Sequence, residues 1–165
     1  MTRNEFWILI DRLISETSGD LGRFEEALDA HLRSLESTEI QKFSDHFAEL
    51  QNAANTPAVL EAAFIIGCGA SNDGFMDFRR WIVFQGKAAY ERIVANPDFL
   101  GHYSPDSDPM ENWYSEYDPS LAYEEVTGED PPYFEVDVYP DERSDCEKND
   151  ILADRYPELW RRCKS

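Results

Sequence analysis

The sequence predicts a mostly α protein, built as a single compact helical domain of about six to eight helices. Apolar residues recur at three- and four-residue intervals through most of the first hundred positions, as on the buried face of a helix. The 165 residues, 42% of them hydrophobic, are enough for one well-filled core. We expect a helical core at 1–103 and, packed on the same domain, an acidic and partly irregular extension at 104–165.

Capping signals mark where the first three helices should begin. Thr2 and Glu5 have the spacing of a capping box, in which each side chain bonds the other residue's backbone N–H. Asp20 is placed to cap a second helix, and Thr38 with Gln41 to cap a third. Each signal precedes a stripe of apolar residues at helical spacing, so three amphipathic helices are expected.

The middle of the chain predicts a buried helix, a long helix and a short one. Pro57 suits the first turn of a helix whose residues 58–66 are apolar nearly all round, which indicates the most buried helix. A glycine-rich turn at 67–70 precedes an apolar stripe that continues from about residue 74 to 95. An Asn-Pro pair then opens a short helix at 96–101.

The C-terminal third has a different character. Its segment 104–109 is rich in Pro, Ser and Asp and predicts a linker. Residues 110–126 have helical spacing, although Pro119 should break or kink that helix. Apolar and acidic residues alternate at 134–138, which predicts one short strand whose partner is not evident in the chain. Residues 147–162 predict a closing helix.

Acidic charge is the extreme feature of the composition. The chain has 34 Asp and Glu against 15 Lys and Arg, a net charge of −19, and residues 104–150 alone contain 16 acids and two bases. A field of this sign repels nucleic-acid phosphates and anionic membranes and attracts basic protein surfaces. We therefore expect a basic protein partner, no direct contact with nucleic acid and no membrane. The simpler alternative is a charge that serves solubility.

Cysteine usage and hydropathy indicate a cytoplasmic protein. Cys68, Cys146 and Cys163 are odd in number and lack C-x-x-C spacing, which is typical of reduced thiols. No apolar stretch of secretory length follows Met1, and no run approaches the roughly 18 apolar residues of a membrane span.

No recognisable set of catalytic or cofactor-binding residues is evident. His46 and Glu49 stand one helical turn apart, and His31 could join them, but a metal site needs further ligands at consistent spacing. The chain contains no G-x-S-x-G elbow, no Walker loop and no H-E-x-x-H helix. We expect no metal and no cofactor, and we favour a binding protein over an enzyme without assigning a catalytic residue.

The start of the predicted long helix is the candidate ligand site. Asp73 and Asp77 lie four residues apart, so both project from one face and could hold a metal or act as acid and base. Arg79, close to Trp81, could stack on an aromatic ring or bind a carboxylate. The competing interpretation is structural: Asp73 caps the helix, Asp77 pairs with Arg80 or Arg79, and Arg79 forms a buried pair with an Asp.

Three segments carry a family resemblance. They are Phe6-Trp7-Ile8-Leu9-Ile10-Asp11, Phe43-Ser44-Asp45-His46-Phe47-Ala48-Glu49-Leu50 and the core from Asn72-Asp73-Gly74-Phe75 through Phe78-Arg79 and Trp81-Ile82 to Gly86. Together they resemble a bacterial family known as domain of unknown function 4240, over most of residues 1–101. The resemblance implies a small bacterial protein of a kind sometimes found beside a WGR module, which is nucleic-acid-associated and which this chain does not contain. It implies no activity.

Two functions are consistent with these patterns. The first is a protein-interaction or regulatory module that uses the acidic C-terminal third, in a specialised form as an inhibitor or immunity-like protein. The alternative is an enzyme or small-ligand binder with a site at Asp73, Asp77, Arg79 and Trp81.

Overall fold

The computed structural model describes residues 1–67, 71–103, 113–132, 134–140 and 148–164. The mostly α prediction is confirmed: these ranges contain nine α-helices and one 3-10 helix, and no strand. The helices are α1 (Arg3–Glu16), α2 (Leu21–Arg33), α3 (Ser37–Ala53), α4 (Pro57–Ile66), α5 (Asn72–Val83), α6 (Lys87–Ala95), η1 (Pro97–Gly101), α7 (Ser120–Thr127), α8 (Asn149–Arg155) and α9 (Pro157–Lys164).

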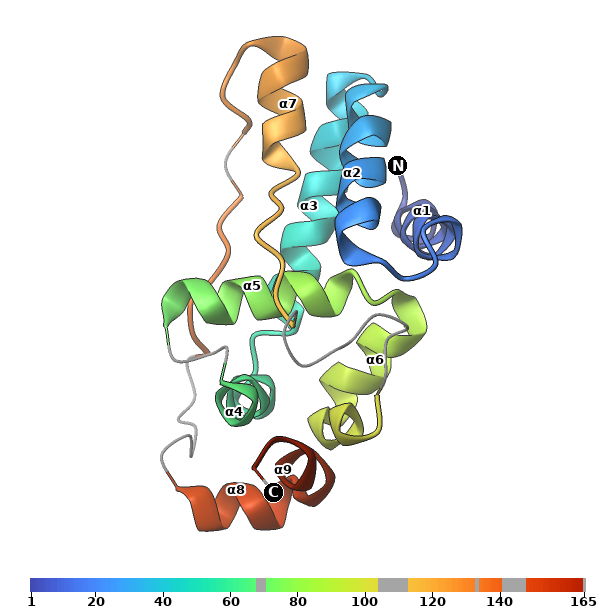
Figure 1. The fold of residues 1–165 in the computed structure, drawn as a ribbon. Helices are drawn as coiled ribbons and strands as arrows, with labels where there is room; N and C mark the ends of the chain where they lie inside the picture. The colour runs from blue at the N-terminus through green and yellow to red at the C-terminus, as the bar shows by residue number, and fades with distance from the viewer. Residues whose placement is uncertain (68–70, 104–112, 133, 141–147, 165) are drawn as a thin grey trace.

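Helix α5 crosses the middle of the molecule and separates two groups of helices (Figure 1). Helices α1, α2, α3 and α7 lie on one side of it, and α4, α6, α8 and α9 lie on the other. Its buried residues include Phe75, Phe78 and Ile82, each fully inaccessible to solvent, so both groups share one core around this helix. Among the residues described, no helix combines the length and the hydropathy needed to cross a bilayer.

The predicted caps are confirmed for two of the first three helices. Thr2 and Glu5 form the full capping box of α1, and the Asp20 carboxylate accepts from the backbone N–H of Arg23 at 2.8 Å at the start of α2. The cap predicted for α3 is wrong. This helix begins at Ser37 after Glu36, which makes no side-chain cap, so Thr38 already lies inside the first turn.

The long helix predicted at 74–95 is two helices. Gly86, between α5 and α6, has φ +90°, a backbone conformation that residues other than glycine rarely adopt. A Cβ on Gly86 would lie 2.6 Å from Oδ1 of Asp11, the atom that accepts from the backbone N–H of Lys87 at 3.1 Å. An aspartate from α1 thus starts α6, a distant contact that the continuous apolar stripe did not reveal.

Two further helix predictions are wrong in extent. The helix predicted at 110–126 begins only at Ser120, and residues 113–119, which we call the strap, form neither helix nor strand; residues 110–112 lie outside the described ranges. The closing helix is split into α8 and α9 at Tyr156, because the proline that follows disfavours the helical conformation there. Together with the break at Gly86, this split takes the number of helices above the predicted six to eight.

The strand predicted at 134–138 is not a strand. The side-chain amide of Asn52, on α3, donates to the Glu135 carbonyl and accepts from the Asp137 N–H, both at 2.9 Å. The backbone polar groups of this segment therefore bond to a side chain and not to a second strand. This explains why no second strand could be found in the sequence.

Helix α9 packs on η1 through main-chain contacts. Oδ1 of Asp98 accepts from the backbone N–H groups of Glu158 and Leu159, both at 2.9 Å, and so caps α9 from another element. Gly101 lies so close to Glu158 that a Cβ would meet its backbone. This tight approach joins the C-terminal helices to the core. The division of the chain into a core and an extension at residue 103 stays a prediction.

Candidate functional site

Helix α5 points the four predicted site residues in different directions. Asp73 is exposed, Asp77 is half-buried, and Arg79 and Trp81 are buried, with 0% and 3% of their surface exposed. Ser71, not Asp73, caps the helix by accepting from the Gly74 N–H at 3.1 Å. A ligand-binding role for the four residues stays a prediction; the structure does not bring them to one surface.

Arg79 joins three parts of the fold. Its guanidinium donates to the main-chain carbonyl of Gln51 at 3.2 Å and to that of Asp137 at 2.6 Å, and lies 4.6 Å from the ring centroid of Phe75. The expected partner was a carboxylate, and the hydrogen-bond partners found are carbonyls. Burial lowers the pKa of Arg79 to about 10.

Asp77 contacts the neighbouring arginine, one of the two partners expected for it. Nη1 of Arg80 donates to Oδ1 of Asp77 at 3.0 Å. Burial still raises the pKa of Asp77, and the nearby carboxylates of Glu116 and Asp73 act in the same direction. The main-chain carbonyl of Asp77 accepts from the Ser115 N–H at 3.0 Å, which attaches the strap to α5.

Trp81 holds the beginning of the strap. Its ring stacks on Trp113 with centroids 5.3 Å apart and planes 3° apart, and Trp113 is itself 1% exposed. The Arg162 guanidinium lies 5.1 Å from the Trp113 ring centroid. Trp81 therefore has a packing role that residue spacing could not reveal, because Trp113 is distant in the sequence.

The strap and α7 form an acidic face beside α2. Residues 113–132 contain six acids and no lysine or arginine. Ser115 Oγ donates to the Glu25 carboxylate at 2.5 Å, and burial, with Glu116 nearby, raises the pKa of Glu25. Tyr117 donates its hydroxyl to Asp29 at 3.1 Å. Arg33 pairs with Asp29 and with Glu125, and so offsets part of this charge from α2.

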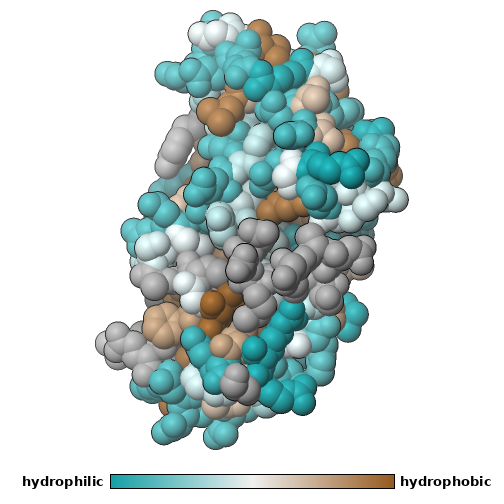
Figure 2. Space-filling model, viewed as in Figure 1, coloured by the Kyte–Doolittle hydropathy of each residue, from teal (hydrophilic) through white to brown (hydrophobic). Residues whose placement is uncertain are grey.

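Exposed apolar side chains interrupt this acidic face. Tyr114 in the strap is 45% exposed, and Leu121 and Val126 on α7 are 53% and 42% exposed. The surface seen in Figure 2, viewed as in Figure 1, is mostly hydrophilic where α7 and α2 lie, with small isolated hydrophobic spots. We call the strap together with α7 and residues 128–130 the acidic face.

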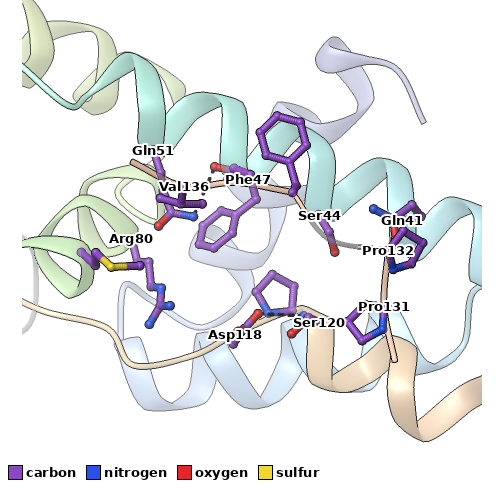
Figure 3. A pocket seen from close by; sticks show the side chains of 14 residues that line it. Gln41, Ser44, Phe47, Gln51, Arg80, Asp118, Ser120, Pro131, Pro132 and Val136 are labelled. Atoms are coloured by element: carbon purple, nitrogen blue, oxygen red, sulfur yellow. Dashed lines mark hydrogen bonds between the residues drawn. The ribbon is translucent and has the colours of Figure 1, made fainter. Parts of the chain in front are cut away.

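A cleft of about 290 Å³ lies between α3, α5, the start of α7 and residues 131, 132, 134 and 136. Figure 3 shows Gln51, Phe47, Ser44 and Gln41 along α3, with Arg80 and Asp118 opposite. The sequence did not predict this cleft, because its walls come from segments far apart in the chain. Gln41, Arg80 and Pro119 had been singled out for other reasons, as a cap, as a partner of Asp77 and as a helix break, and none of them as a ligand contact.

His46 and Glu49, the one-turn pair that was not expected to form a metal site, lie near each other on α3. His46 Nδ1 lies 3.8 Å from Oε2 of Glu49. In the parts of the chain that the structure describes, no group of three or more His, Cys, Asp and Glu side chains could hold a metal ion. Cys68 and Cys146 lie outside those parts.

Comparison with known families agrees with the resemblance seen in the sequence. A family described as "Protein of unknown function (DUF4240)" matches residues 1–127, and the chain belongs to this family. The match ends where α7 ends, so α8 and α9 lie beyond it. Neither a search of curated proteins nor one of solved structures gives a significant match to this chain.

Proposed function

We propose that this protein is a cytoplasmic protein-interaction module that binds a basic partner protein through the acidic face. The observation that carries the proposal is the composition of residues 113–132, where six carboxylates occur without one lysine or arginine. Glu116, Glu124, Glu129 and Asp130 in this stretch are exposed. Such a field accelerates encounter with a positive protein surface and repels phosphate backbones.

The exposed apolar residues support a protein partner in particular. Leu121 and Val126 stand on the same short helix as Glu124 and Glu125. Protein interfaces combine an apolar centre with a polar rim, and charge around the rim mainly sets the association rate. A surface that served solubility alone would gain nothing from large exposed apolar side chains among its acids.

Affinity capture from the source organism at low salt, followed by binding measurements with the purified partner, tests the proposal. The triple variant Glu124→Gln, Glu129→Gln, Asp130→Asn removes three exposed carboxylates of the acidic face. It should weaken binding about tenfold at low salt, mainly through the association rate, and less at high salt, where screening already weakens the attraction.

A matched triple variant elsewhere provides the control. Glu16→Gln, Glu91→Gln, Asp154→Asn removes the same charge from exposed positions on α1, α6 and α8. It should change the affinity less than twofold, since these sites lie outside the acidic face. Equal effects of the two triple variants, or the absence of any basic protein among those retained at low salt, would refute the proposal.

A specialised form of this function is an inhibitor or immunity-like protein for a basic enzyme. An enzyme that acts on phosphate-containing substrates has a positive active-site surface, and an acidic face of this kind would cover it. A basic enzyme encoded next to this gene, and inhibited by the protein in an activity assay, would favour this form. If the enzyme kept full activity while bound to this protein, the inhibitor function would be excluded.

A further inference from the structure

We propose that the cleft between α3, α5 and residues 131, 132, 134 and 136 binds a small molecule that carries a cationic, hydrogen-bond-donating nitrogen group on an apolar body. The site is separate from the acidic face and goes beyond the proposed interaction with a protein. Its floor is α3, and its opposite wall holds Arg80 and Asp118 (Figure 3).

Two glutamine oxygens at the cleft lack hydrogen-bond partners. Gln51 is 3% exposed, and its Oε1 is buried without a partner in the described structure; the same is true of Oε1 of Gln41. The amide nitrogens are already used, by the Phe47 carbonyl at 3.5 Å and by the Asp45 carboxylate at 2.7 Å. Since a carbonyl and a carboxylate only accept, the amides cannot be turned round without losing these bonds.

Buried polar atoms in folded proteins nearly always have partners, so the Gln51 oxygen indicates that a donor belongs at its end of the cleft. A ligand N–H group would satisfy it, while Gln41 stands at the opposite end of the cleft (Figure 3). Ser44 adds a third acceptor to the same wall, because its hydroxyl donates to the Ile40 carbonyl at 3.1 Å and keeps its lone pairs free to accept. The α3 wall of the cleft is therefore richer in acceptors than in donors.

The charges that line the cleft favour a cation. Arg80 contributes a positive charge, but Asp77 offsets it at 3.0 Å. Asp118 contributes a carboxylate, whose Oδ1 accepts from the Ser120 N–H at 2.9 Å; within the described ranges it forms no ion pair with a basic side chain. The remaining charge is negative, as it is for the chain as a whole.

The remaining walls fit an apolar body. They consist of the apolar residues Phe47, Ala48, Met76, Pro119, Pro131, Pro132, Phe134 and Val136. The volume of about 290 Å³ corresponds to about ten water molecules at roughly 30 Å³ each, near the lower limit of small-molecule pockets. A single aromatic ring with one amidinium or ammonium group has this size.

Three probes of equal shape test the inference on the full chain. Benzamidine is a cationic donor, benzamide is neutral and benzoate is an anionic acceptor. Isothermal titration and backbone amide shifts should show benzamidine binding at α3 and at 131–136, at least tenfold more tightly than benzoate, with benzamide between them. No saturable benzamidine binding at millimolar concentrations, or benzoate binding as tightly, would overturn the proposal.

Two variants locate the contacts. Gln51→Met keeps the side-chain length and removes the orphaned oxygen, and it should weaken benzamidine and benzamide alike by about tenfold. Asp118→Asn keeps an acceptor for Ser120 but removes the charge, so it should weaken benzamidine and leave benzamide unchanged. Asp154→Asn, which removes an exposed carboxylate on α8 outside the cleft, is the matched control and should change neither.

Thermal melting of each variant without ligand separates lost binding from lost folding. If Gln51→Met fails to fold, Asp118→Asn still decides the question, because it conserves an acceptor for the Ser120 N–H at the start of α7. Unchanged benzamidine affinity in folded Asp118→Asn would overturn the proposed cation site.

Discussion

Glu61 and Arg155 form an ion pair that ties the C-terminal helices to the centre of the molecule. Nη1 of Arg155 lies 2.7 and 2.8 Å from the two carboxylate oxygens of Glu61, which is 2% exposed on α4. The Tyr156 hydroxyl donates to the same carboxylate at 2.5 Å. Helices α8 and α9 lie beyond the matched family range, so this pair fastens a segment outside that range to a helix within it.

We expect Arg155→Met to destabilise the protein by about 3 kcal/mol. The variant removes the cation of a buried ion pair, which typically costs about 3–5 kcal/mol, and the Tyr156 bond that Glu61 keeps places the effect at the lower end. Urea denaturation measures it. Glu61→Gln should cost less, because the arginine is 44% exposed on its side chain and can turn to water. The reverse order of the two variants would contradict this account.

Arg79→Lys should destabilise the fold by about 3 kcal/mol despite conserving the charge. A lysine ammonium cannot span the carbonyls of Gln51 and Asp137 as the planar guanidinium does, so buried carbonyl groups lose their donors. Residues 134–140 should then be cleaved faster in limited proteolysis. Asp73→Asn, exposed on the same helix, should stay within about 0.5 kcal/mol of the wild type. If both variants lost the same amount of unfolding free energy, the loss in Arg79→Lys would not come from these two hydrogen bonds.

The raised pKa of Glu25 predicts a gain in stability for Glu25→Gln at pH 7. Burial makes the folded protein hold this proton more tightly than the unfolded chain does. The carboxyl group therefore lowers the stability at pH values above its folded pKa, and this loss is relieved as the pH falls through that pKa. Glutamine keeps an acceptor for Ser115 and cannot ionise. The melting temperature should therefore exceed that of the wild type at pH 7, with the difference vanishing at acidic pH, below the unfolded carboxyl pKa.

The exposed Glu26→Gln on the same helix is the control for this pH series and should leave the melting temperature unchanged. If Glu25→Gln were less stable than the wild type at pH 7, the hydrogen bond from Ser115 to the ionised carboxylate would contribute more free energy than the burial of that carboxylate costs.

Added salt should stabilise the protein at pH 7. At a net charge of −19 the folded chain repels itself, and salt screens exposed charges far more than buried pairs such as Glu61 and Arg155. We expect the melting temperature to rise between low salt and about 0.3 M, where the Debye length is below about 8 Å. A flat or falling response in scanning calorimetry would indicate that a bound cation already neutralises the acidic face.

Local patterns predicted the elements whose causes are local. The capping box at Thr2, the cap at Asp20 and the proline start of α4 each depend on residues within one turn. The buried stripes of the first helices follow in the same way from helical periodicity. The break at Gly86 is the opposite case, because Asp11 from another helix stabilises it.

By itself, the sequence determined the helical class, the excess of acid and the family, because composition, periodicity and short motifs do not depend on distant neighbours. The tertiary structure decided what the singled-out residues contact. It buried Arg79 under the 137–138 carbonyls, stacked Trp81 on Trp113, and replaced the missing strand partner with the Asn52 amide. It also assembled the cleft around Gln51 from segments far apart in the chain, and contacts at such separation leave no local pattern for sequence reasoning to detect.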